Sequence, residues 1–302
     1  SDIYSPYLPA AKQGETAHRY VLGLYHIMDE LTTRFPEILF EGCSSGGNRF
    51  DLGILSYFPQ IWASDNTDAL CRTGIQNSYS YGYPLSVFTA HVSSCPNHQT
   101  LRITPLETRF QVASFGVLGY ECNLKDLSGS DLSAIREQIT LYKKWRDLFQ
   151  FGTFYRGTEN EDSDSETLSW TCVSPDGRRA VGLFFRRLTV PNQSHDWYRP
   201  VGLLPDVKYH FYGRNIKYNL KDFGDLVNTV SPVHIKQGSA LQEILSRFVN
   251  MNGEKEELTA YGDTLMRAGI ALKPAFAGTG YNSDTRLFPD FSSRIYFMEA
   301  VE

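Results

Sequence analysis

The chain has 302 residues, of which 41% are hydrophobic and 21% charged, and its formal net charge is −5. This length suffices for two ordinary domains. The small net charge and the absence of a Lys/Arg-rich run argue against nucleic acid and anionic membranes as partners. No apolar run approaches the ~20 residues that cross a bilayer, and the first residues lack the basic-then-apolar form of a signal peptide.

Five cysteines are spread through the chain, at Cys43, Cys71, Cys95, Cys122 and Cys172. Their number is odd and no two of them form a CxxC pair, so we expect neither a disulfide framework nor a zinc ribbon. Reduced thiols in a cytoplasmic protein are the simplest account of this set.

The first half of the chain alternates helical patterns with short apolar runs. Apolar residues recur at helical spacing over 14–35, where Pro36 ends the pattern, and over 131–148. Further helical segments are predicted at 54–57, 68–78 and 105–114. The apolar runs predict strands at 38–40, 61–63, 85–92 and 115–121. This alternation, at a period of roughly 25–35 residues, is typical of βα units with parallel strands.

The pattern changes after Gln150. An acidic stretch at 160–166 predicts a solvated loop, and the residues 175–177 (Pro-Asp-Gly) predict the turn of a hairpin. Short alternating runs predict strands at 168–173, 180–188, 198–203, 209–212 and 293–301. Two short helices are predicted, at 240–248 and 258–266. We therefore predict that residues 1–150 form a parallel α/β domain, whose four strands are too few to close an eight-stranded barrel, and that residues 151–302 form mainly an antiparallel β-sandwich.

Polar residues follow the first two predicted strands. The strand at 38–40 leads into Cys43 and a Ser-Ser-Gly-Gly turn, and the strand at 61–63 leads into Ser64 and Asp65. Reactive groups of (β/α) barrels lie where strands give way to loops, so Asp65 is the candidate for the chemistry. The local alternative is that Asp65 caps the following helix. Asp68 is expected to be structural.

Four segments in this order and spacing carry a resemblance to a known family. They are CSSGGNRFD (43–51), WASDNTD (62–68), HVSSCPNHQT (91–100) and FGVLGYE (115–121). Together they resemble the bacterial-type α-galactosidases of glycoside hydrolase family 36, strongly over residues 1 to about 148 and more loosely beyond. The resemblance implies a retaining glycosidase built on a (β/α)8 barrel, with an N-terminal β-supersandwich before the barrel and a smaller β domain after it. Residues 1–150 would then form the second half of the (β/α)8 barrel, and residues 151–302 the C-terminal β-sandwich domain.

The resemblance also implies roles for individual residues. The acid/base carboxylate of the family is the first Asp of a W-x-S-D-x-T-D motif, which falls on Asp65. Cys43 would lie beside the galactose 2-hydroxyl, and Gly46 would let the backbone approach the sugar. Trp62 could give Asp65 an apolar cover. The alternative for Cys43 is a buried small hydrophobe. Asn48 departs from the glycine that many members carry.

The second carboxylate of a retaining mechanism is missing from this chain. In the family it belongs to a K-W-D-x-N-R motif upstream of the helix at 14–35. The similar run Lys144-Trp145-Arg146-Asp147 is rejected, because it lies on a predicted helix and its order differs. We expect upstream residues of the natural protein to supply the nucleophile and complete the barrel, and the present segment alone to be inactive.

The implied activity is removal of terminal α-galactosyl residues from raffinose-type oligosaccharides, without a metal or an organic cofactor. Similar proteins are commonly homo-oligomers, often tetramers. Three alternatives stay open: an α-N-acetylgalactosaminidase, a raffinose-type transglycosylase and a non-catalytic carbohydrate-binding protein. His91, Cys95 and His98 could be interpreted as metal ligands, but a fourth partner of matching spacing is missing.

Overall fold

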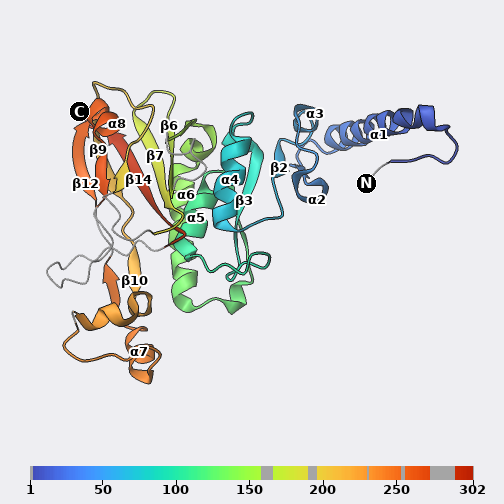
Figure 1. Ribbon diagram of the computed structural model, residues 1–302. Helices are drawn as coiled ribbons and strands as arrows, with labels where there is room; N and C mark the ends of the chain where they lie inside the picture. Colours follow the sequence, from blue (N-terminus) through green and yellow to red (C-terminus); the bar gives the residue numbers. More distant parts are fainter. Residues whose placement is uncertain are drawn as a thin grey trace.

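The computed structural model describes residues 3–157, 166–189, 196–229, 231–252, 256–272 and 290–301. Figure 1 shows a helical arm that leads into a parallel α/β region, followed by an antiparallel β region with a small projecting lobe. Nearly all of the predicted acidic loop, 160–165, lies outside the described residues. Among the helices that are described, none has both the length and the apolar composition needed to cross a membrane.

Four parallel strands form one sheet. They are β1 (Glu41–Gly42), β2 (Gln60–Trp62), β3 (Phe88–Ser93) and β4 (Val117–Glu121). Their order in the sheet is β1-β2-β3-β4, so each strand pairs with its neighbour in the chain. Sequential parallel order is how strands follow one another around a (β/α)8 barrel. The prediction of a parallel, barrel-type α/β region is therefore confirmed.

Helices precede, separate and follow these strands. They are α1 (Gln13–Arg34), α2 (Ser44–Gly47), α3 (Leu52–Leu55), α4 (Ala69–Tyr79), α5 (Leu106–Ser114) and α6 (Gly129–Phe151), with single 3-10 turns at Ala10–Lys12, Leu85–Val87 and Leu124–Asp126. A capping box of Ser128 and Asp131 starts α6. The predicted strand at 38–40 is wrong, because the chain pairs with β2 at Glu41 and Gly42 instead.

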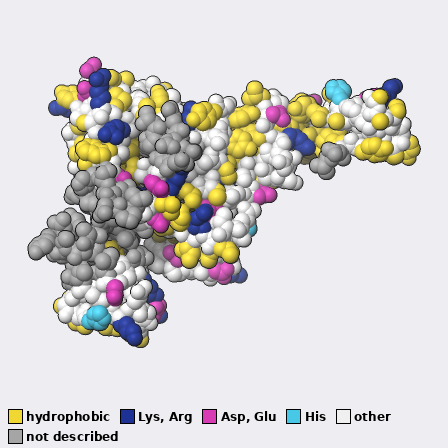
Figure 2. Space-filling view, in the orientation of Figure 1, with side chains coloured by type: hydrophobic (Ala, Val, Ile, Leu, Met, Phe, Trp, Pro, Cys, Tyr) yellow, Lys and Arg dark blue, Asp and Glu magenta, His cyan; other side chains and the backbone are white. Residues whose placement is uncertain are grey.

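The helix α1 extends away from the sheet (Figure 1). Met28 is its one buried residue, and it packs against Ile54 and Ile61. Apolar side chains of α1, including Leu22 and Ile27, are exposed, and Figure 2 shows hydrophobic atoms along this arm. The arm therefore presents an apolar surface that the described residues do not cover.

The second region is built on a six-stranded antiparallel sheet in the order β12-β9-β14-β7-β6-β5. The strands are β5 (Thr153–Arg156), β6 (Thr167–Val173), β7 (Arg179–Arg186), β9 (Lys208–Gly213), β12 (Glu257–Tyr261) and β14 (Ser292–Ala300). The β6–β7 hairpin turns at Gly177, whose φ is +69°, as its Pro-Asp-Gly sequence predicted. The predicted antiparallel β domain is thus confirmed.

One face of this sheet is covered by a smaller layer. The strands β8 (Asp196–Tyr198) and β13 (Ile270–Leu272) pair, and together with α8 (Gly262–Arg267) they share a buried cluster with the sheet. Two predictions are wrong here. The strand at 198–203 ends at Tyr198, and the first half of the helix at 258–266 is β12, because those residues pair with β9.

A small lobe interrupts the chain between β9 and β12. It contains β10 (Lys217–Asn219), β11 (Asn250–Asn252), the 3-10 segment Leu220–Thr229 and α7 (Ala240–Leu245). Its own small core includes Leu220, Phe223 and Ile235. In Figure 1 it projects from the sheet, below β9 and β14.

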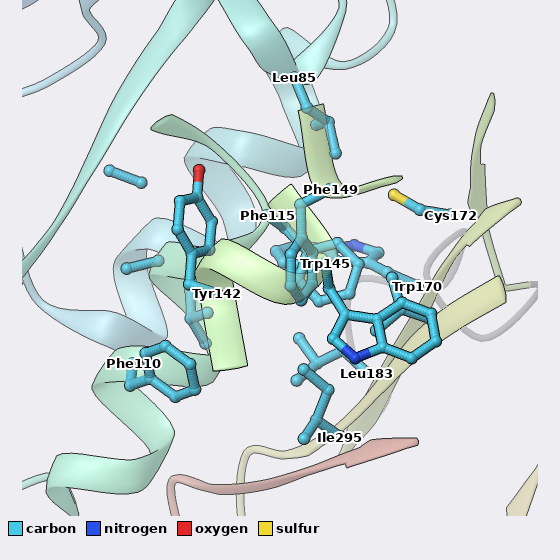
Figure 3. Close-up of a cluster of buried hydrophobic side chains, with 14 of the residues drawn as sticks. Leu85, Phe110, Phe115, Tyr142, Trp145, Phe149, Trp170, Cys172, Leu183 and Ile295 are labelled. Carbon is cyan, nitrogen blue, oxygen red and sulfur yellow. The ribbon is translucent and has the colours of Figure 1, made fainter. Parts of the chain in front are cut away.

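The largest buried cluster joins the parallel and antiparallel regions (Figure 3). Trp145 of α6 lies 4.7 Å from Phe297 of β14, measured between ring centroids. Phe115 lies 5.3 Å from Trp170 of β6 by the same measure. Residues from both sides of position 150 share one core, so the two regions stabilise each other. The division into two domains at residue 150 stays a prediction.

Replacing Trp145 by Ala should lower the free energy of unfolding by about 3–5 kcal/mol, since the indole is 1% exposed and its loss leaves a cavity. Urea unfolding of the natural protein measures this. Lys143→Ala, on the exposed side of the same helix, is the matched control and should change stability by less than about 0.5 kcal/mol. Equal effects of the two substitutions would contradict the packing described here.

Candidate active site at the strand ends

The residues after β1 form an unusual turn. Ser44, Ser45, Gly46 and Gly47 have φ values of 54°, 56°, 78° and 85°. The Gly47 amide donates a hydrogen bond to the Cys43 carbonyl at 2.8 Å, so the turn is one left-handed helical turn. L-residues avoid this conformation at a cost of roughly 1–2 kcal/mol each, and such strain is concentrated at functional sites. Asn48 supports the turn by donating to the Ser45 carbonyl at 2.7 Å.

The two glycines of this turn pack against the loop after β2. A β-carbon at Gly47 would lie 2.4 Å from the carbonyl oxygen of Ala63. A β-carbon at Gly46 would lie 3.0 Å from Cγ of Asp65. Gly47 therefore has no room for a side chain, and a side chain at Gly46 would be strained at a φ of +78° and would have to displace Asp65. Gly46, which was predicted to face the sugar, contacts the candidate carboxylate, and its approach to a sugar stays a prediction.

Asp65 lies in the loop after β2 with its side chain exposed. The indole Nε1–H of Trp62 donates a hydrogen bond to Asp65 Oδ1 at 2.8 Å. Trp62 thus contacts Asp65 through its polar edge, where an apolar cover was predicted. The alternative interpretation of Asp65 as a helix cap is wrong, because α4 begins at Ala69 and Asp68 is its N-cap.

Arg72, near the start of α4, hydrogen-bonds to the backbone of the loop that carries Asp65. It donates to the carbonyls of Ser64 at 2.6 Å, Asn66 at 2.8 Å and Thr89 at 3.2 Å. Its guanidinium carbon lies 4.5 Å from the centroid of the Trp62 ring. Burial lowers the pKa of Arg72 to about 10, although the charges of Glu121 and Asp65 oppose this, so the side chain is a cation at neutral pH. Sequence reasoning missed this residue.

Two further polar residues lie on the neighbouring strands. The His91 ring on β3 lies 4.6 Å from the Trp62 ring, and His91 Nδ1 is 3.2 Å from Glu121 Oε2 at the end of β4. Gly119 pairs with His91 and leaves room for it, since a β-carbon there would lie 2.5 Å from the imidazole. Within the described ranges, no three His, Cys, Asp or Glu residues are grouped as metal ligands.

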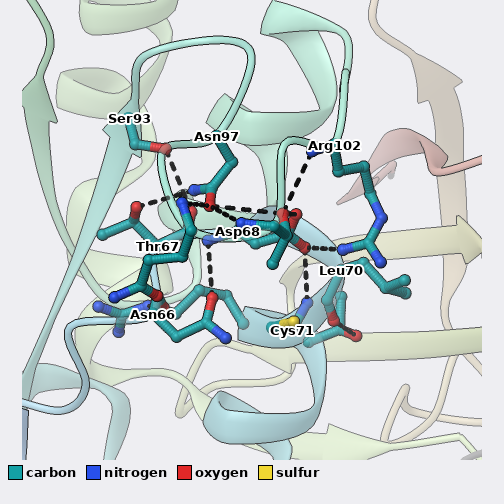
Figure 4. A network of polar contacts seen from close by, with 12 residues as sticks. Asn66, Thr67, Asp68, Leu70, Cys71, Ser93, Asn97 and Arg102 are labelled. Carbon is teal, nitrogen blue, oxygen red and sulfur yellow. Dashed lines mark hydrogen bonds and ion pairs between the residues drawn. The ribbon is translucent and has the colours of Figure 1, made fainter.

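Asp68 ties the loop after β2 to the loop after β3 (Figure 4). Its carboxylate accepts hydrogen bonds from the Cys71 amide at 3.0 Å and the Thr100 hydroxyl at 2.7 Å, and the Arg102 guanidinium lies 2.6 Å away. Burial alone would raise the pKa of Asp68, but these three partners outweigh it and hold the pKa below its ordinary value. Asp68 is structural, as its sequence position predicted.

The structure also places Cys43 and the Lys-Trp-Arg-Asp run that were named from the sequence. The thiol of Cys43 is exposed, so the alternative of a buried small hydrophobe is wrong. The Lys144-Trp145-Arg146-Asp147 run lies on α6 with Trp145 in the core, which agrees with its rejection as a nucleophile motif.

Comparison with known proteins identifies the family. Residues 1–152 match the melibiase family, and residues 167–298 match the glycosyl hydrolase family 36 C-terminal domain. Alpha-galactosidase 1 of Pediococcus pentosaceus is 49% identical over 209 residues, which are 69% of this chain and 28% of that protein. Alpha-galactosidase AgaA of Geobacillus stearothermophilus is 45% identical over 216 residues, or 72% of this chain and 29% of its own.

Solved structures that resemble this chain are also α-galactosidases. The α-galactosidase from Lactobacillus brevis aligns with a TM-score of 0.77 and 35% identity, over 100% of this chain and 34% of its own. A variant of AgaA in complex with raffinose aligns with a TM-score of 0.75 and 37% identity over the same shares.

The parallel strands, the site at their carboxyl ends and the attached β domain define part of a glycoside hydrolase barrel with its C-terminal domain. The chain belongs to glycoside hydrolase family 36, and its relatives are α-galactosidases, which confirms the resemblance drawn from its motifs. It spans 28% and 29% of the length of the two curated α-galactosidases named above.

Gly47→Ala should destabilise the protein by more than about 1 kcal/mol, because the new methyl group would meet the Ala63 carbonyl and because φ is +85°. Gly74→Ala is the matched control, since Gly74 lies within α4 and a methyl group added there would meet no atom within 4 Å. The control should be neutral or stabilising by up to about 1 kcal/mol. Chemical denaturation compares the two, and a neutral Gly47→Ala would contradict the close approach.

Asp68→Asn should lower the free energy of unfolding at neutral pH by about 1–3 kcal/mol, because it weakens the charged pair with Arg102. The folded-state pKa of Asp68 is depressed, so its stabilisation is complete above the ordinary carboxyl pKa and is lost as pH falls through the folded value. Unfolding measured from pH 7 to pH 3 should show the two proteins converging below about pH 4. A difference that persists or widens in acid would contradict this assignment.

Proposed function

We propose that this chain supplies the acid/base side of a retaining α-galactosidase site, with Asp65 as the acid/base carboxyl. The observation that carries the proposal is the position of Asp65, exposed beyond the end of β2, bonded to Trp62 and packed against the Gly46 turn. Cys43 is proposed to contact the sugar 2-hydroxyl from the same turn. Family membership supports these roles.

The proposed reaction has two steps. In the first, a second carboxylate attacks the anomeric carbon, the glycosidic C–O bond breaks, and protonated Asp65 gives its proton to the departing oxygen. A galactosyl ester and ionised Asp65 remain. In the second, Asp65 takes a proton from water as the water oxygen attacks the anomeric carbon, and the ester C–O bond breaks. Galactose leaves with its anomeric configuration retained, and both carboxyl groups return to their starting states.

The second carboxylate is proposed to come from a preceding segment of the natural protein. Two features support this. In the described sheet the outer strands β1 and β4 each pair with one neighbour only, so the β1 edge is open, as is the β4 edge. The apolar side chains of α1, such as Leu22 and Ile27, are exposed within the described part of the chain. A preceding set of βα units would pair with the edge and bury these side chains, and the present segment without them would be inactive.

We propose raffinose-type oligosaccharides as substrates, since variants of AgaA were solved in complex with raffinose and with stachyose. The Cys43 thiol beside a 2-hydroxyl favours galactose over its N-acetylated counterpart. Transglycosylation uses the same first step, with a sugar replacing water in the second. We further propose a homo-oligomer that needs no cofactor, and a cytoplasmic location, which the five unpaired cysteines support.

Asp65→Ala in the full-length protein should lower kcat/KM for raffinose by about 10²–10⁴-fold, because a sugar leaving group depends on protonation. An aryl α-galactoside with a good leaving group should lose far less in its first step, and azide should partly restore its turnover. Steady-state kinetics on both substrates measures this.

Asp147→Ala is the matched control, because Asp147 is an exposed carboxylate of the look-alike motif on α6, and both activities should be unchanged. Equal losses of the Asp65 variant on both substrates would overturn the acid/base role. A full-length protein that binds raffinose without hydrolysing it would favour the alternative of a carbohydrate-binding protein.

A further inference from the structure

Arg72 clamps the backbone on both sides of Asp65. It donates to the carbonyl of Ser64, the preceding residue, at 2.6 Å and to the carbonyl of Asn66, the following residue, at 2.8 Å. A third bond, to the Thr89 carbonyl at 3.2 Å, ties this clamp to β3. One planar guanidinium can reach three acceptors in different directions, whereas a lysine ammonium is a compact point charge on a flexible stem.

Arg72 also acts on the side-chain partner of Asp65. Its guanidinium carbon lies 4.5 Å from the centroid of the Trp62 ring, and the same ring donates its Nε1–H to Asp65 at 2.8 Å. Stacking on a cation limits the positions that the indole can take. The main chain of Asp65 and its hydrogen-bond donor therefore depend on the same guanidinium.

The burial of Arg72 shows that this arrangement has an energetic cost. The residue is 2% exposed, and a charged group is expensive to remove from water. An apolar residue on this face of α4 would fill the same space without that cost. The carbonyls that Arg72 binds belong to the loop that carries Asp65 and to the neighbouring strand β3. The buried charge therefore fixes this loop to β3.

We infer that Arg72 is a positioning residue for the acid/base step, which holds the Asp65 carboxyl at the glycosidic oxygen through the Ser64 and Asn66 carbonyls and through Trp62. The inference rests on the proposed role of Asp65. Arg72 is almost fully buried, so the inference gives it no contact with the substrate or with the reacting atoms. Its effect on rate follows from geometry, since displacing a catalytic group by about 1 Å can cost about 10²-fold.

The test uses the full-length protein with Arg72→Gln and, as the conservative variant, Arg72→Lys. With raffinose, Arg72→Gln should lower kcat by about 10–100-fold with a much smaller change in KM. With an aryl α-galactoside that has a good leaving group, the first step should fall less than about fivefold, and azide should accelerate turnover. Arg72→Lys, which keeps the charge but not the fork, should be intermediate.

Arg109→Gln is the matched control. Arg109, on α5, is also a partly buried arginine that donates to main-chain carbonyls, those of Ser93 at the end of β3 and of Thr104 before α5, but neither carbonyl belongs to the loop of Asp65. The Arg109→Gln variant should have a lower melting temperature, but the ratio of its activities on raffinose and on the aryl α-galactoside should be unchanged. A purely structural role for Arg72 would likewise lower both activities equally, and that result, or unchanged kinetics, would overturn the inference.

A double variant separates this inference from the proposed function. If Arg72 acts through Asp65, adding Arg72→Gln to Asp65→Ala should change kcat on raffinose by less than about twofold. Additive losses would overturn the positioning role. If Asp65→Ala itself fails to distinguish the two substrates, the proposed function fails. If it does distinguish them and Arg72→Gln does not, the inference alone fails.

Discussion

The hydrogen bond from the Trp62 indole to the Asp65 carboxylate, made against the bare backbone of Gly46, is the constraint on which the site depends. The loops after β1 and β2 meet where Gly46 packs on Asp65 and Gly47 packs on the Ala63 carbonyl, an approach that leaves little room for a side chain at either glycine. The left-handed turn that allows this approach is strained at Ser44 and Ser45. The turn also leaves the thiol of Cys43 exposed beside the same edge of the sheet, where a sugar is proposed to bind.

The loop of Asp65 is held by the helix that follows it, and that helix is anchored in the β domain. Asp68 and Arg72 of this segment fix the loop from one side. At the other end of α4, Trp170 of β6 donates to the Asn77 side chain at 3.2 Å, and Arg156 of β5 donates to the Ser80 hydroxyl at 2.9 Å. The antiparallel sheet thus contributes to the site indirectly, by fixing the position of α4.

Local patterns predicted much of this architecture. Period and apolar content placed α1, α4, α5, α6 and three of the parallel strands, and the strand-end rule selected Asp65. The errors arose in segments whose secondary structure depends on pairing with another strand. β1 forms at Glu41–Gly42 because those residues meet β2, and β12 is a strand because β9 lies beside it. Arg72 and the His91–Glu121 pair were missed for a similar reason. Their roles arise from contacts with residues 6 to 30 positions away, and no local spacing indicates them.

The central claim is that the Asp65 carboxyl transfers the proton to and from the oxygen at the anomeric carbon. The most direct measurement is a crystal structure of the full-length Asp65→Asn variant with intact raffinose bound. The account predicts the substituted side chain within about 2.6–3.2 Å of the glycosidic oxygen, still held by Trp62. A side chain turned away from that oxygen, with a different carboxyl group in its place, would contradict the account.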